Sequence, residues 1–72
     1  MMGCWYLSFV DGTGFLGGTF LMADDFVPAV ERAWALGINP GGQVGGIPVP
    51  PNLVPGPRFI ERLLTREEVQ AL

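Results

Sequence analysis

The fold of this chain is decided by Cys4-Trp5-Tyr6-Leu7-Ser8-Phe9-Val10-Asp11-Gly12. Residues 4–10 alternate between two faces and are rich in aromatic and β-branched side chains, which predicts a strand with Trp5, Leu7 and Phe9 on one face. Asp-Gly directly after a strand is a strong turn signal, because glycine adopts positive φ freely. A second strand, over about residues 18–23, is therefore expected to return antiparallel to the first.

The residues after this hairpin predict one amphipathic helix. Asp25 can cap its N-terminus, which places Pro28 at the third helical position, where no intrahelical N–H is required. Gly37 provides a left-handed stop at its C-terminus. Apolar residues at helical spacing form one face: Phe26, Val30 and Ala33. This helix is expected to cover one face of the sheet.

A turn and a third strand come next. Asn39-Pro40-Gly41-Gly42 fits a type II turn, with proline at the second position and glycine at the third. Residues 43–49 predict a short strand, and its Gly45-Gly46 pair and Pro48 suit the edge of a sheet. Placing this strand beside the first gives the order second, first, third, with antiparallel neighbours.

The C-terminal part divides into an arm and a tail. Residues 50–57 are dense in proline and predict an extended arm with little sheet content. Thr65-Arg66-Glu67-Glu68 is a capping box, so a short helix should begin at Arg66, preceded by a turn of helix over residues 58–63. We predict a single α+β domain: a ββαβ core (1–49) with a three-stranded, mainly antiparallel sheet and one main helix, a Pro-rich arm (50–57) and a helical tail (58–72).

The composition predicts self-association. Of the 72 residues, 49% are hydrophobic and only 15% are charged, well under the usual quarter or so. A chain of this length has too small a core for so much apolar surface, and a homo-oligomer would bury the excess. The candidate interface residues are Trp5, Tyr6, Trp34, Leu53 and Val54.

The charged and reactive residues exclude several functions. The net charge is −3, and no basic residue precedes Arg32, which argues against nucleic acid and anionic membranes as partners. The chain has no His and a single cysteine, Cys4, so it lacks the ligands of a zinc site and the Ser-His and Cys-His nucleophile pairs. We expect a cytoplasmic protein without catalytic residues, metal or cofactor.

A glycine-rich segment follows the first strand: Gly12-Thr13-Gly14-Phe15-Leu16-Gly17-Gly18. It resembles the Gly-rich turn of extended short-chain dehydrogenases, but a dinucleotide fingerprint needs a helix after its turn and an acidic residue about 20 residues on, and both are missing. We interpret it as a hairpin connection. The alternative is an anion nest made by backbone N–H groups of Gly12, Thr13, Gly14, Gly17 and Gly18, helped by Arg58 and Arg62.

Three segments carry a second resemblance: Gly14–Gly17, Leu36–Gly42 and Arg62–Glu68. Together they make the chain similar to short uncharacterised proteins of bacteriophages and high-GC bacteria. The resemblance implies a fold and a genomic setting and brings no catalytic residue with it.

These observations leave two functions to compare. The first is a non-catalytic, homo-oligomeric interaction module, a phage-type accessory protein that blocks a host protein or sequesters a small signal. The alternative is a nucleotide-like ligand bound by the Gly12–Gly18 loop. An enzyme is disfavoured, because acid–base chemistry would rest on Asp and Glu alone and no motif pairs them.

Overall fold

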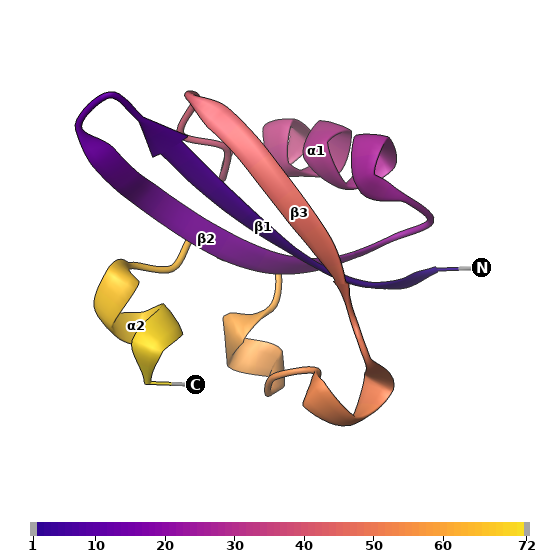
Figure 1. Ribbon diagram of the computed structural model, residues 1–72. Coiled ribbons are helices and arrows are strands. Elements are labelled where there is room, and N and C mark those ends of the chain that lie inside the picture. The colour runs from indigo at the N-terminus through magenta and orange to yellow at the C-terminus, as the bar shows by residue number, and fades with distance from the viewer. Residues whose placement is uncertain (1, 72) are drawn as a thin grey trace.

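The computed structural model of the protein describes residues 2–71 and confirms the α+β fold. The elements in chain order are β1 (Gly3–Asp11), β2 (Gly14–Ala23), α1 (Phe26–Ala35), β3 (Gln43–Val49), two 3-10 turns η1 (Pro51–Leu53) and η2 (Pro57–Phe59), and α2 (Arg66–Gln70). The sheet order is β2-β1-β3, and β1 is antiparallel to both neighbours (Figure 1). The predicted order and the predicted bounds of the third strand are both confirmed.

The hairpin differs from the prediction in where its second strand begins. β2 starts at Gly14, so the turn is only Gly12-Thr13, and most of the glycine-rich segment belongs to the strand. The register shifts opposite Phe9 and Val10, which leaves Leu16 as an extra residue in a β-bulge. Because a bulge interrupts the alternation of side chains, sequence periodicity recognises only the regular part of the strand.

The main core lies between the sheet and α1. Leu7, Phe9 and Leu21 are fully buried on this face, together with Ala29 and Ala33 of the helix. The predicted helical face is confirmed, since Phe26 and Val30 also pack against this cluster. Asp25 is the N-cap, and its carboxylate accepts a hydrogen bond from the Phe26 N–H at 2.8 Å.

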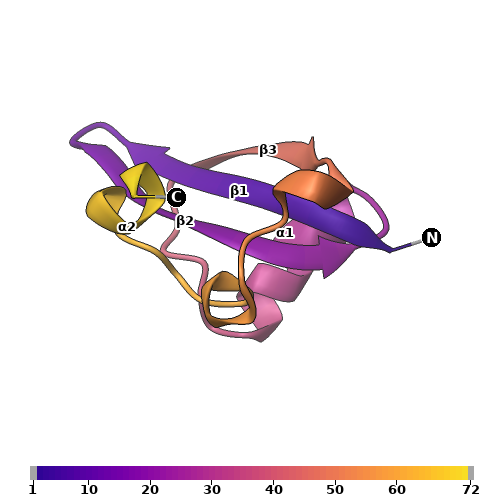
Figure 2. The ribbon, with the colours of Figure 1, turned by 90° about the horizontal axis from the view of Figure 1, so that it is seen from below.

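The C-terminal tail closes the outer edge of β2. Gly18 and Leu64 exchange two backbone hydrogen bonds, with N···O distances of 3.0 and 2.6 Å, and the Glu61 N–H donates to the Phe20 carbonyl at 2.7 Å. The predicted turn of helix over residues 58–63 is therefore wrong after Phe59. Beyond Phe59 the chain forms backbone hydrogen bonds to β2 instead, and Glu61 takes a positive φ of 58°. Figure 2 shows the tail passing along the sheet.

The arm and the last helix complete the tail. The arm is not extended throughout, because Pro51–Leu53 forms η1. The capping box is confirmed: Glu68 N–H donates to the Thr65 hydroxyl at 3.2 Å, and Thr65 N–H donates to the Glu68 carboxylate at 3.1 Å. The sequence located this helix correctly because its start depends on four adjacent residues alone.

The capping box makes a first prediction. Thr65→Ala removes the cap and should lower the free energy of unfolding by about 0.5–2 kcal/mol, measured by urea denaturation. Thr65→Ser keeps a hydroxyl acceptor and should behave like the wild type. Partner binding should not change in either variant beyond what the stability loss explains. A loss of binding at an unchanged Tm would show that the tail itself makes the contact.

Candidate functional site

The face of the sheet opposite α1 carries a second, smaller aromatic cluster. Tyr6 and Phe20 are directly paired across β1 and β2, and their ring centroids lie 4.9 Å apart. The Tyr6 ring also lies over Gly18, where an added Cβ would stand 2.6 Å from the Tyr6 hydroxyl oxygen. Gly18 therefore has a packing role, because any larger residue would displace the Tyr6 side chain.

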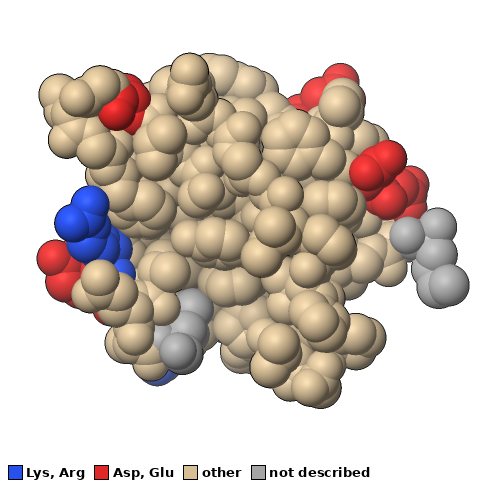
Figure 3. Space-filling model, viewed as in Figure 1, with Lys and Arg blue, Asp and Glu red and all other residues tan. Residues whose placement is uncertain are grey.

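A groove opens beside this cluster, between the sheet, the arm and α2. We call it the arm groove, and its volume is about 270 Å³. The sheet, the arm with η1, and α2 all contribute lining residues, and the arm and α2 lie on the same side of the sheet (Figure 1). Its lining residues are uncharged: Tyr6, Phe20, Ile47, Pro48, Val49, Pro50, Leu53 and Val69. Figure 3 shows that charged side chains lie at the margin of this side of the molecule.

The chemistry of the arm groove favours apolar contact. Burial raises the pKa of the Tyr6 hydroxyl above its usual value, so this group stays neutral at pH 7. Ligand pockets for drug-sized molecules have volumes of about 300–1,000 Å³, and the arm groove lies just below that range. Its volume is comparable to that of one or two apolar side chains, and the Tyr6 and Phe20 rings form the aromatic part of its lining.

The glycine-rich segment is engaged by the protein itself. The Asp11 carboxylate accepts hydrogen bonds from the Thr13 N–H at 2.7 Å and from the Thr13 hydroxyl at 2.6 Å. These bonds lower the pKa of Asp11, the hydroxyl bond most. Gly18 N–H donates to Leu64, as described above. An anion placed here would have to compete with a carboxylate that already occupies the turn.

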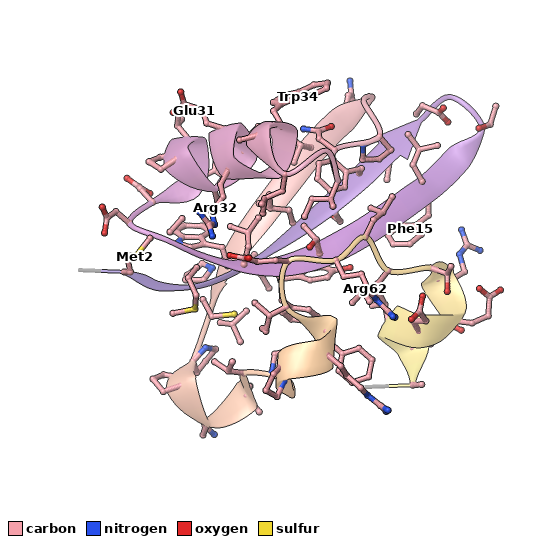
Figure 4. The ribbon with its side chains drawn as sticks, turned by 180° about the vertical axis from the view of Figure 1, so that it is seen from behind. Met2, Phe15, Glu31, Arg32, Trp34 and Arg62 are labelled. Atoms are coloured by element: carbon pink, nitrogen blue, oxygen red, sulfur yellow. The ribbon has the colours of Figure 1, made fainter. Side chains whose placement is uncertain are left out.

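The predicted arginines lie in a different hollow. Arg58 and Arg62 line it together with Phe59, Glu68 and Ala71. The Arg58 guanidinium stands 4.8 Å from the centre of the Phe59 ring, and Arg62 forms an ion pair with Glu68 (Figure 4). The arginine that reaches the hairpin is Arg66, 5.8 Å from the centre of the Phe15 ring. The sequence prediction did not include it.

The structure divides the predicted interface residues between surfaces. Tyr6 and Leu53 come together in the arm groove. Trp5 and Val54 line a neighbouring hollow at the Gly3 end of β1, and the Trp5 ring also packs 6.3 Å from Phe26 on the core side. Trp34 lies on the side of α1 that faces away from the sheet and is 60% exposed (Figure 4).

The predicted interface did not include the other six residues that line the arm groove, among them Phe20, Ile47 and Val69. Phe20 and Ile47 are the cross-strand partners of Tyr6, so the correct register would have placed both on its face. Val69 lies in α2, whose own sequence pattern indicates only the helix. Its place in the groove depends on how the tail docks, which no local pattern indicates.

Comparison with known proteins adds nothing to this geometry. Models of known protein families, curated proteins and solved structures give no match to this chain. Among residues 2–71, no helix is long and apolar enough to cross a membrane. Within the same residues, no three Cys, Asp or Glu side chains come together in a way that could hold a metal ion.

Proposed function

We propose that the protein is a non-catalytic interaction module that works as a homo-oligomer and holds apolar side chains of a protein partner in the arm groove. The observation that carries the proposal is the groove itself, which has an aromatic floor and uncharged walls from three separate parts of the chain. An exposed apolar concavity of this kind is typical of a protein-binding surface.

The exposed apolar residues support the oligomer. Val27 and Trp34 of α1, Ile47 of β3 and Leu53 of η1 are each at least 60% exposed. Scattered single residues of this kind are common on monomers, but this chain combines them with few charges. A second copy would cover part of this surface and add buried area to a small core.

The partner we propose is a host protein in the bacterial cytoplasm. This follows from the resemblance to short phage and high-GC bacterial proteins and from the apolar chemistry of the groove. Blocking a host protein requires only a surface that fits it, which a domain of this size can provide. The alternative is the sequestering of a small nucleotide-like signal, which a thermal-shift panel with nucleotides distinguishes.

A peptide array tests the groove. We expect short peptides with a large apolar anchor to bind the wild type, and Leu53→Asp to weaken that binding at least about tenfold, which corresponds to about 1.4 kcal/mol. Leu36→Asp is the matched control, because Leu36 is exposed but lies outside the groove lining. Peptides that bind Leu53→Asp and the wild type equally would contradict the proposal.

A thermal-shift panel with NAD, ATP and a cyclic dinucleotide completes the test. We expect no change in Tm with any of them. A ligand present at a hundred times its Kd would stabilise the protein by about 2.7 kcal/mol, which is a shift of several degrees for a domain of this size. A shift that Gly14→Ala removes would favour the glycine-rich loop as the binding site instead.

A further inference from the structure

The two edges of the sheet differ. The outer edge of β2 is closed by backbone hydrogen bonds to the tail, as described above. Among residues 2–71, no backbone hydrogen bond reaches β3 from any segment other than β1. In Figure 1, β3 lies at the border of the sheet. A strand with one free edge presents a row of unpaired N–H and C=O groups to another chain.

The β3 edge has few of the features that prevent such pairing. Proteins protect free edges with charged side chains, especially lysine, with proline or with bulges. None of the seven residues of β3 is charged, and its register with β1 is regular. Pro48 is the one protective residue, and it stands second from the end of the strand. Because Pro48 has no N–H to donate to β1, its backbone nitrogen and carbonyl should point toward the free edge of the sheet.

A protruding side chain and a hollow lie side by side on this edge. Ile47 is 61% exposed. Beside it is a hollow of about 290 Å³ over Gly45, walled by Tyr6 and Ser8. An added Cβ at Gly45 would meet only the Ser8 hydroxyl oxygen, at 3.7 Å. Ile47 and Gly45 are two residues apart, so they belong to the same face of the sheet.

We propose that β3 pairs with β3 of a second copy, antiparallel about a two-fold axis at Gly46, and joins the two sheets into one. This inference rests on the proposed homo-oligomer and names its interface. In this register, Gly45 of each copy lies opposite Ile47 of the other, so each isoleucine enters the other hollow. The two Gly46 residues exchange N–H···O bonds, and the Val44 N–H donates to the Pro48 carbonyl of the other copy. Pro48 has no N–H, so the return bond to the Val44 carbonyl is absent at each end of the interface.

The occupant is a second copy because the strand is complementary to itself. The side chain and the hollow lie on the same strand at the spacing that a two-fold axis requires, so each copy supplies what the other lacks. The absence of charge on β3 means that the pairing brings no like charges together within the strand, although each chain carries a net charge of −3. A C2 interface is self-complementary in this way.

Sedimentation equilibrium of three proteins tests the interface. We expect the wild type to be a dimer at about 50 μM, a concentration at which an interface of micromolar Kd is largely occupied. Ile47→Lys should be largely monomeric at the same concentration, because it would place an ammonium group in an apolar hollow. Val27→Lys makes the same change of charge at a residue that is also exposed, on α1, and should remain a dimer.

The outcomes separate this inference from the proposed function. A monomeric wild type overturns both the edge pairing and the homo-oligomer. If the wild type and Ile47→Lys are both dimers, the oligomer stands and the β3 interface is wrong. Circular dichroism of each variant shows whether it has kept its fold, and both substitutions change exposed side chains.

A crosslink tests the register separately. Opposite residues of a non-hydrogen-bonded antiparallel pair have Cα atoms about 4.5 Å apart, within the range that a disulfide spans. The double variant Gly45→Cys with Ile47→Cys should therefore oxidise to a covalent dimer. Ile47→Cys alone should not, because Gly45 of the other copy then lies opposite the new thiol, and the native Cys4 is buried. Equal crosslinking of the single and double variants would contradict the axis at Gly46.

Discussion

Phe9→Ala is expected to lower the free energy of unfolding by about 3–5 kcal/mol. Among the described residues, Phe9 is the largest fully buried side chain, and it belongs to the core cluster that β1 and β2 form with Ala29 and Ala33 of α1. Its removal leaves a cavity that the neighbouring strands can only partly close. For a chain of 72 residues, a total stability of roughly 4–11 kcal/mol is typical, so this variant should be close to unfolding at room temperature.

Urea denaturation followed by circular dichroism measures the effect. Val10→Ala is the matched control, because Val10 is the next residue along β1 and is 39% exposed. It should change stability by less than about 0.5 kcal/mol. Similar losses in the two variants would show that the main core does not lie on the α1 face of the sheet.

Leu64→Ala is expected to cost about 2–5 kcal/mol and to weaken the arm groove as well. Leu64 is 1% exposed, and its backbone holds the tail against Gly18 of β2. Loss of its side chain should loosen the segment that positions Val69, which forms part of the groove wall. We therefore expect lower stability together with weaker binding of the apolar peptides.

Denaturation and peptide titration of the same variant measure both effects. Leu53→Ala provides the comparison, because Leu53 is 64% exposed and lines the groove directly. It should weaken peptide binding while leaving stability within about 0.5 kcal/mol of the wild type. A Leu64→Ala variant that kept full stability would contradict the role assigned to the tail contact.

Local chemistry explains which parts of the fold could be predicted. The caps at Asp25 and Thr65 could be predicted because they depend on neighbouring residues alone. β2 began earlier than predicted because the bulge at Leu16 interrupts its alternation. The course of residues 60–64 could not be predicted, because their partners are the free backbone groups of β2.

The same distinction applies to the candidate site. Tyr6 and Leu53 were predicted as contact residues and do line the arm groove. Phe20 and Ile47 required the strand register, and Val69 required the docked tail. The groove is formed by segments far apart in the chain, so its existence follows from tertiary structure and has no signature in any single stretch of sequence.

The central place of β1 in the sheet also sets an order for refolding. β2 follows β1 after a two-residue turn, so this hairpin can close within about 1–10 μs. β3 reaches β1 only after the chain has passed through α1, and closing that longer loop costs more entropy. Until β3 arrives, one side of the most apolar strand stays unpaired. That interval is when newly made chains are most exposed to aggregation, and a faster-forming hairpin would not shorten it.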